Sequence, residues 1–173
     1  MTMKTIAQLF HLSGKGAVVT GGAMGIGQGI AYRLAEAGAG VMVADIDLKA
    51  ATQTVEQIKA RGGKAQAIRA DVRSAADAEK VAQATVDAFG SLDILVNNAG
   101  IFPFSKFLDT SEEFWDKVLD VNLKGAFLYS QAAARAMIKG GHGGKIINLA
   151  SIEAFKHWWG TYPIVPPRAV WSC

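Results

Sequence analysis

Glycine residues cluster near the start of the chain, where they could hold phosphate groups. Residues 20–27 read Thr-Gly-Gly-Ala-Met-Gly-Ile-Gly and directly follow a short apolar run. Gly21, Gly25 and Gly27 would let the backbone turn tightly and approach a pyrophosphate, toward which a helix beginning here would direct its free N–H groups. An ordinary glycine-rich turn is the alternative. The order of strand, glycines and helix favours a dinucleotide site that includes Ile26.

One carboxylate stands where the ribose of a dinucleotide would need it. Asp45 ends the second predicted strand, 18 residues beyond Gly27, close to the spacing of about 20 at which an acid hydrogen-bonds the ribose 2′-hydroxyl. A carboxylate there repels the 2′-phosphate of NADP, and no Arg or Lys lies between Gly21 and Gly27 to attract that phosphate. The sequence therefore favours NAD over NADP. The alternative is that Asp45 or Asp47 only caps a helix.

These side chains require a parallel sheet behind them. Short apolar runs occur at residues 17–19, 41–43, 65–68, 94–96 and 146–149. Continuous apolar runs of this length predict strands that are buried on both faces of a parallel sheet. Together with the helical segments between them, they predict an α/β fold, a doubly wound Rossmann sheet with strand order 3-2-1-4-5.

Helical periodicity fills the intervals between the runs. The first helix has an apolar stripe expected to consist of Ile26, Ile30 and Leu34. Two capping boxes are expected for later helices, Ser74 with Asp77 and Thr110 with Glu113. The second box should open one long helix over residues 111–139.

Five short motifs follow one another along the chain. They are the glycine segment 20–27, Asp71-Val72, Asn97-Asn98-Ala99-Gly100, Asn122 within residues 120–125, and Ser151 at the end of the fifth strand. In this order they resemble the short-chain dehydrogenase/reductase family, from residue 10 to about residue 160. The resemblance implies an NAD-dependent oxidoreductase that interconverts a secondary alcohol and a ketone, often on a sugar, polyol or acyl derivative, and that assembles as a homotetramer or dimer.

The resemblance also implies which residues hold the cofactor. Asp71 and Val72 would contact the adenine. Asn97 would help to join the central strands. The cofactor trough would be lined by Asn98, Ala99 and Gly100. Asparagine is also common in turns, which is the structural alternative for this motif.

Two residues are implied as catalytic. Asn122 would hold a water molecule of the proton relay, and its unfavourable place inside a helix supports a functional interpretation. Ser151 would hydrogen-bond the substrate oxygen, although a loop hydroxyl is the alternative.

The other half of the family's catalytic group is absent from the printed sequence. Members carry a Tyr-x-x-x-Lys pair shortly after the serine, whereas Tyr162 is followed four residues later by Pro166 and no lysine comes after it. Arg168 is permanently charged and differs in shape, so it does not replace the lysine. Hydride transfer by this chain is therefore expected to fail, and a non-catalytic dinucleotide-binding fragment is the competing hypothesis.

The composition also changes in this region. Residues 154–173 hold three of the four prolines and three of the four tryptophans, and no acidic residue. A one-base shift of the reading frame upstream of Pro163 permits Tyr-Cys-Ala-Ser-Lys, so a frameshift is favoured over a designed tail. We expect an incomplete NAD-binding domain over residues 1–153, lacking the family's last strands and helices, and an aberrant tail over residues 154–173.

Composition excludes several classes of protein. Half of the residues are hydrophobic, which suits a packed core, and a net charge of +3 gives little support to nucleic-acid binding. Cys173 is the only cysteine, so no internal disulfide is expected and a reducing compartment is favoured. No apolar run reaches the ~18 residues of a membrane span, and residues 1–16 do not resemble a signal peptide. A cytoplasmic protein is expected. No metal site is expected, because no ligand spacing connects His11, His142 and His157.

Overall fold

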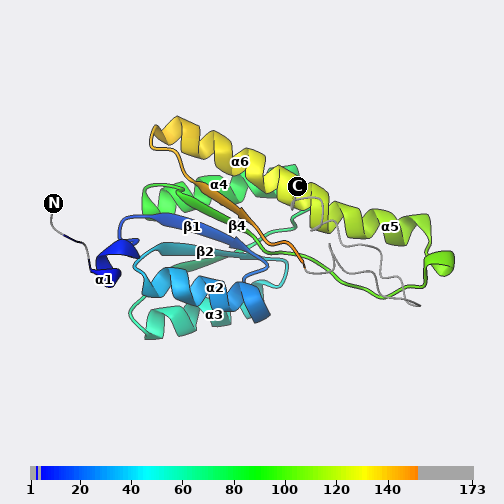
Figure 1. Ribbon diagram of the computed structural model, residues 1–173, viewed down its shortest axis with the longest axis horizontal. Coiled ribbons are helices and arrows are strands. Elements are labelled where there is room, and N and C mark those ends of the chain that lie inside the picture. Colours follow the sequence, from blue (N-terminus) through cyan, green and yellow to red (C-terminus); the bar gives the residue numbers. More distant parts are fainter. Residues whose placement is uncertain (1–2, 4, 152–173) are drawn as a thin grey trace.

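The structure, a computed structural model, describes residue 3 and residues 5–151. Five strands form one parallel sheet in the order β3-β2-β1-β4-β5 (Figure 1). The strands are β1 (Gly16–Thr20), β2 (Gly40–Asp45), β3 (Lys64–Arg69), β4 (Ile94–Asn97) and β5 (Lys145–Asn148). The predicted doubly wound sheet and its strand order are confirmed. The domain boundary predicted at residue 153 lies outside the described residues.

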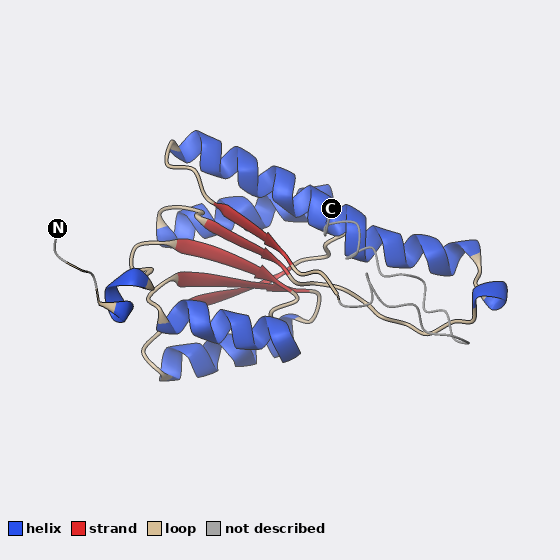
Figure 2. Ribbon diagram, in the orientation of Figure 1, coloured by secondary structure: helices blue, strands red, loops and turns tan. Residues whose placement is uncertain are grey.

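Helices cover both faces of this sheet (Figure 2). One face carries α2 (Gly25–Glu36) and α3 (Leu48–Ala60), and the other carries α4 (Ala75–Phe89) and α6 (Gly125–Gly140). The short helix α1 (Ile6–Leu9) precedes the sheet. A 3-10 turn (Phe107–Asp109) and α5 (Glu112–Leu119) project beyond the carboxyl ends of the strands (Figure 1).

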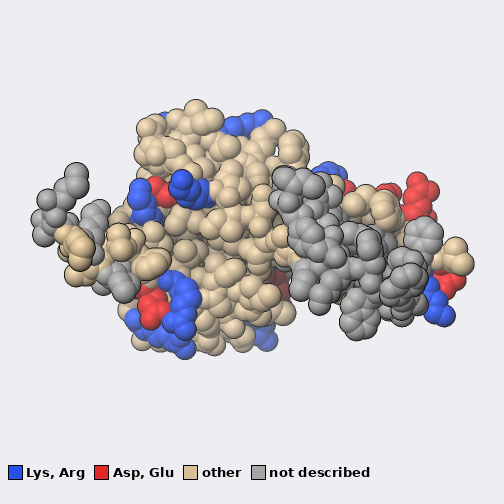
Figure 3. Space-filling model, viewed as in Figure 1, with Lys and Arg blue, Asp and Glu red and all other residues tan. Residues whose placement is uncertain are grey.

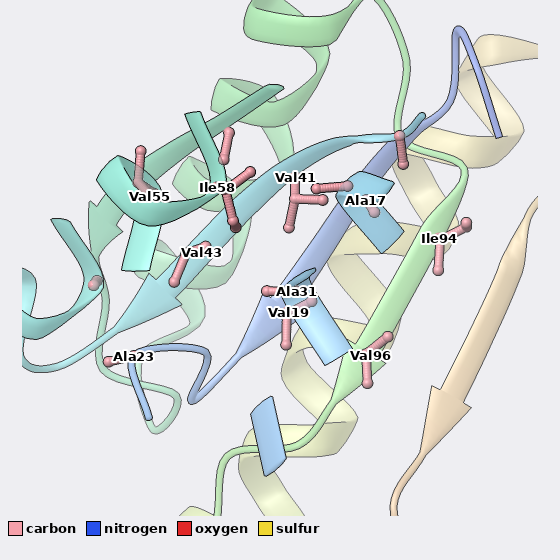
Figure 4. Packing of buried hydrophobic residues seen from close by; sticks show 14 residues of the cluster. Ala17, Val19, Ala23, Ala31, Val41, Val43, Val55, Ile58, Ile94 and Val96 are labelled. Carbon is pink, nitrogen blue, oxygen red and sulfur yellow. The ribbon is translucent and has the colours of Figure 1, made fainter. Parts of the chain in front are cut away.

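Alternate residues of each central strand point to opposite faces, which divides the core into two layers. Ala17 and Val19 pack with the residues of α2 and α3, as Figure 4 shows, whereas Val18 packs with those of α4 and α6. Val18 lies level with Met42 on β2 and Leu95 on β4. All of these side chains are buried, so the two layers fix the register of the three central strands.

The two edge strands differ from the prediction. The sequence predicts β3 and β5 to be buried on both faces, but most of their residues are exposed or half-buried. Ile146 and Ile147 remain 38% and 47% exposed. Both strands lie at an edge of the described sheet, where only one neighbouring strand covers them. An apolar run reports strand propensity and does not report the position of that strand in the sheet.

The first predicted helical stripe is also partly wrong. Gly27, Ala31 and Ala35 are the buried residues of α2. Ile30 and Leu34 pack at the edge of this row, whereas Ile26 is 69% exposed. Small residues face the sheet because they let the helix approach the strands closely.

Both capping predictions need correction. Ser74 Oγ accepts a hydrogen bond from Asp77 N, as predicted, but the Asp77 carboxylate accepts from Asp71 N at 2.8 Å instead of closing the box. The next helix is capped by Ser111, not by Thr110, since Ser111 Oγ accepts from Phe114 N. Residues 111–139 are not one regular helix either, because a π-helical segment (Asp120–Lys124) separates α5 from α6.

A buried carboxylate fixes the start of the sheet. Asp93 is 6% exposed and accepts hydrogen bonds from Lys15 Nζ at 2.7 Å, Gly16 N at 3.0 Å and Ser91 Oγ. Burial by itself would raise the pKa of Asp93, but the bonds from Lys15, Ser91 and Gly16 outweigh it and hold that pKa below its ordinary value. The ionised side chain therefore ties β1 to the loop that precedes β4.

The Asp93→Asn variant should be destabilised by about 1–3 kcal/mol at pH 7, because one donor loses its acceptor. A depressed folded-state pKa contributes stability above the unfolded pKa, about 3.9 for aspartate, that is lost as the pH falls through the folded value. Urea unfolding at pH 7 and pH 3 measures both terms, with the exposed Asp87→Asn as control. A difference between Asp93→Asn and the unaltered protein that does not shrink at pH 3 would contradict this role.

Candidate dinucleotide site

A cavity of about 510 Å³ opens at the carboxyl ends of β1 to β4. It spans the point where the strand order reverses, because β1 has β2 on one side and β4 on the other. Such switch points are where open α/β sheets bind ligands, and the volume suits a small molecule. The cavity is lined by Gly21, Met24, Ile26, Gly27, Ala44, Asp45, Ile46, Ala70, Asp71, Val72, Arg73, Asn98, Ala99, Gly100, Ile101, Lys117 and Val121.

The structure brings together nearly all residues that the sequence predicts for the cofactor. Among them, Gly25 alone is not part of the lining; it occupies the first position of α2 with φ of +57°. The two predicted catalytic residues, Asn122 and Ser151, do not line the described cavity.

Two glycines of the segment, Gly21 and Gly27, are packed so tightly that a side chain would not fit at either position. A Cβ on Gly27 would lie 2.2 Å from Gly21 O and 2.4 Å from Asn98 Nδ2. A Cβ on Gly21, whose φ is +62°, would lie 2.8 Å from the Ala99 Cα. At these two positions the cavity floor is therefore backbone, which a ligand could approach closely.

Thr20 and Asn98 hold the ends of β1 and β4 together beneath the cavity. Asn98 Nδ2 donates to Thr20 O at 3.0 Å and to Gly21 O at 2.9 Å. In return, Thr20 Oγ1 accepts from Asn98 N and Ala99 N, each at 3.1 Å. Thr20 is 2% exposed, and sequence reasoning did not assign it this role. These bonds fix the glycine segment against the loop after β4.

Asp45 binds the backbone of the glycine segment as well as facing the cavity. Its Oδ2 accepts from Ala23 N and its Oδ1 accepts from Asp47 N, both at 3.0 Å. Asp47 is the cap of α3, since its carboxylate accepts from Ala50 N. The two carboxylates thus have separate functions, and only Asp45 is part of the cavity wall.

The start of α2 lies beside Asp45. Met24 is the N-cap residue and makes no side-chain capping bond. A helix N-terminus carries N–H donors and a partial positive charge, which suits an anion. The cavity therefore combines a backbone floor, a helix N-terminus and a carboxylate, as a dinucleotide requires.

An ion pair between Asp71 and Arg73 forms part of the cavity wall. Arg73 Nε donates to Asp71 Oδ1 at 3.0 Å and to Oδ2 at 3.1 Å, and Nη2 donates to Oδ2. The side-chain hydrogen bond from Arg73 is the main reason that the pKa of Asp71 lies below its ordinary value, against a smaller opposing effect of burial. Asp71 therefore faces the cavity as a carboxylate at neutral pH.

Replacing Arg73 with glutamine should raise the pKa of Asp71 toward its ordinary value, because its main hydrogen-bond donor is removed. A pH titration of the Asp71 carboxyl carbon by NMR measures this shift. Arg69→Gln is the matched control, since Arg69 acts on Asp71 only through a weaker, longer-range attraction. An equal rise of the Asp71 pKa in both variants would show that the direct bond is not the cause.

Asn122 binds a backbone segment next to the cavity. It is 4% exposed within the π-helical segment, and its Oδ1 accepts from Ile101 N while its Nδ2 donates to Ile101 O, both at 2.8 Å. Ile101 itself lines the cavity. The unusual position noted in the sequence is thus explained by a π segment, a feature frequent at functional sites.

The fifth strand ends earlier than predicted. β5 stops at Asn148, so the half-buried Ser151 lies three residues beyond it instead of at its end. Asn97 Nδ2 donates to Asn148 Oδ1 at 2.8 Å and to Ser130 Oγ at 2.9 Å, which joins β4 to β5 and to α6. Tyr162, Pro166 and Arg168, on which the expected loss of the Tyr-Lys pair rests, lie outside the described residues.

Several lining residues were not predicted. Met24, Ile46 and Arg73 adjoin predicted residues in the sequence, so the motifs themselves could have indicated them. Lys117 comes from α5, which projects past the sheet, and Val121 comes from the π-helical segment that follows α5. No local signal in the sequence connects these two residues with the glycine segment.

Other classes of site find no support in the described part of the chain. No cluster of three or more possible metal ligands occurs among those residues. His142 Nδ1 lies 3.5 Å from Asp93 Oδ1, and His157 is outside the described residues. Within the same ranges, no helix has the length and apolar character of a bilayer span. On the face shown in Figure 3, the charged side chains form small groups of mixed sign.

Comparison with known proteins agrees with this geometry. The family model described as short chain dehydrogenase matches residues 15–163. The 2-dehydro-3-deoxy-D-gluconate 5-dehydrogenase of Escherichia coli K12 is 43% identical over 87% of this chain and 59% of its own length. The galactitol 2-dehydrogenase of Agrobacterium fabrum is 43% identical over 82% of this chain and 54% of its own length.

A solved structure shows the same likeness. A 7α-hydroxysteroid dehydrogenase complexed with NADH and 7-oxo glycochenodeoxycholic acid superposes with a TM-score of 0.88 at 34% identity, over 97% of this chain and 65% of that chain. The chain thus spans little more than half the length of the two curated relatives. The family match extends over most of the chain and includes every element that lines the cavity. The chain belongs to the short chain dehydrogenase family.

Proposed function

We propose that this chain binds NAD in the cavity at the carboxyl ends of β1 to β4. The observation that carries the proposal is that the glycine segment, the start of α2 and Asp45 line one cavity. The pyrophosphate would lie over Gly21, Gly25, Ile26 and Gly27, where backbone and a helix N-terminus face the ligand. Proteins of this family bind NAD or NADP, and the steroid dehydrogenase of similar structure holds NADH.

The remaining walls would hold the two ends of the cofactor. Asp45 would accept a hydrogen bond from the adenosine ribose, and Asp71 with Val72 would contact the adenine. The trough toward the nicotinamide would be lined by Asn98, Ala99 and Gly100. These side chains fit the group, because the carboxylate faces a hydroxyl-bearing ribose and the backbone floor faces the phosphates.

NAD is favoured over NADP because the cavity's charges oppose a 2′-phosphate. The Asp45 side chain accepts two backbone hydrogen bonds, and these hold it in the cavity wall. Two cations also line the cavity, but the guanidinium of Arg73 is bound to Asp71. The other cation of the lining is Lys117 of α5.

The reaction we propose for this site, in a chain that carries the family's complete catalytic group, is the interconversion of a secondary alcohol and a ketone. Bound NAD would be the hydride acceptor. Ser151 would hydrogen-bond the substrate oxygen, and Asn122 would hold the loop at Ile101 and a water molecule of the proton relay. The names of the two curated relatives point to a polyhydroxylated sugar acid or polyol as the substrate class.

A second function is favoured by one feature of the sequence. Because Pro166 stands four residues after Tyr162, the chain as printed has no Tyr-x-x-x-Lys pair. We infer that residues 1–153 act as a dinucleotide-binding domain and that the chain, with residues 154–173 as printed, does not turn over substrate. A cytoplasmic location, and the homotetramer or dimer of the family, complete the proposal.

Two measurements test these proposals. Calorimetric titration with NAD, NADP and ADP-ribose should show binding with NAD preferred over NADP. A panel of sugar acids, polyols and other secondary alcohols, followed by NADH absorbance, should show no turnover. Absence of NAD binding would refute the site, whereas turnover that is lost in Ser151→Ala would refute the non-catalytic alternative and establish the reaction.

A further inference from the structure

The described methionines differ sharply in exposure. Met42 and Met137 are 1% and 5% exposed, whereas Met24 and Met3 are 64% and 93% exposed. Met24 is the one that lines the cavity, and Met3, which precedes α1 in the sequence, is not among the lining residues. One readily accessible thioether therefore stands in the candidate cofactor site.

Met24 lies in the glycine segment where α2 begins and where the backbone binds Asp45. It is the N-cap of α2, between Gly25 and Ala23, whose N–H donates to the Asp45 carboxylate. Two further exposed apolar side chains, Ile26 and Ile46, line the same cavity at 69% and 57% exposure. Bound dinucleotide would cover this apolar rim, so the rim should contribute to affinity through its apolar contact area.

We propose that Met24 is a site of reversible oxidation that lowers the affinity of this cavity for NAD, a proposal that rests on the function proposed above. Hydrogen peroxide would be the oxidant. Its O–O bond breaks as an S–O bond forms at the thioether, the transferred oxygen's proton passes to the departing hydroxide, and water leaves. Sulfur loses two electrons and becomes the sulfoxide, and the peroxide is reduced by the same two electrons.

The chemistry of the sulfoxide explains the lower affinity. Oxidation converts an apolar side chain into a polar one with a strong acceptor oxygen. That oxygen would lie near the Asp45 carboxylate and the anionic pyrophosphate. Because a sulfoxide has no hydrogen-bond donor, it could form a hydrogen bond with neither anion. The thioether's apolar contact is lost at the same time, so a weakening of about fivefold is expected.

Selective oxidation can be followed by peptide mass spectrometry after graded exposure to hydrogen peroxide. A Cys173→Ser background removes the chain's only thiol, which would otherwise react first. Met24 and Met3 should be oxidised well before Met42 and Met137. Saturating NAD should slow the oxidation of Met24 but not that of Met3. Equal rates with and without NAD, in protein that binds NAD, would overturn the proposal.

The second experiment measures whether oxidation of Met24 lowers the affinity for NAD. After peroxide treatment, the Cys173→Ser protein should bind NAD about fivefold more weakly than before, and so should Met3→Leu in the same background. Treatment with methionine sulfoxide reductase should restore the affinity. Met24→Leu, compared with itself before and after peroxide, should show no change. Unchanged affinity after complete oxidation of Met24 would refute this proposal alone, whereas failure of the reduced protein to bind NAD would refute the proposed function.

Discussion

Replacing Gly27 with alanine should weaken NAD binding by about 10- to 100-fold, the equivalent of the 1–3 kcal/mol that an overpacked site costs. The added Cβ would lie 2.2 Å from a backbone oxygen of the glycine segment. That oxygen belongs to Gly21, which Asn98 holds in place, so the segment has no free direction in which to move. Calorimetric titration with NAD measures the loss.

Gly29→Ala is the matched control for this experiment. Gly29 lies two residues further along α2, and a Cβ there would meet nothing within 4 Å. Alanine in place of an exposed helical glycine stabilises a helix by up to about 1 kcal/mol. The control variant should therefore bind NAD normally and unfold at a higher denaturant concentration. Equal affinity in the two variants would mean that the close approach at Gly27 is not needed for the ligand.

The order of the strands could be predicted because each apolar run is short, continuous and separated by a helical interval. The burial of β3 and β5 could not, since an edge position depends on which strands are neighbours. Ile146 is as apolar as Ile94, but it is 38% exposed and Ile94 is 9% exposed. Tertiary context, which a local pattern does not contain, decides the difference.

The candidate site likewise has features that could be predicted from the sequence and features that could not. Glycine spacing and an acid at the end of the second strand are local, and the structure brings those residues into one cavity. Asp77 is a different case, because the loop after β3 offers Asp71 N as a better partner than the cap. The unfavourable place of Asn122 inside a helix could be recognised from the sequence, but the π-helical form of that segment could not. Asn122 in this segment binds the backbone of Ile101, a contact between residues that are distant in the sequence.

Asp45→Asn should produce the largest change in cofactor preference. The carboxylate is proposed to accept a ribose hydroxyl, and hydrogen bonds to a charged group contribute about 1.5–3 kcal/mol, or roughly 10- to 100-fold in NAD affinity. Loss of the negative charge would also remove the repulsion of a 2′-phosphate. The ratio of NAD to NADP affinity should therefore fall by about 100-fold.

The neighbouring carboxylate separates this local effect from a general change in charge. Asp47→Asn removes the same charge two residues away, and asparagine caps a helix about as well as aspartate, so α3 should stay intact. Its cofactor preference should remain that of the unaltered protein. Parallel titrations of both variants with NAD and NADP measure the ratio. A similar fall in both variants would place the selectivity in the overall field of the cavity. No fall in either variant would refute the assignment of Asp45 to the ribose site.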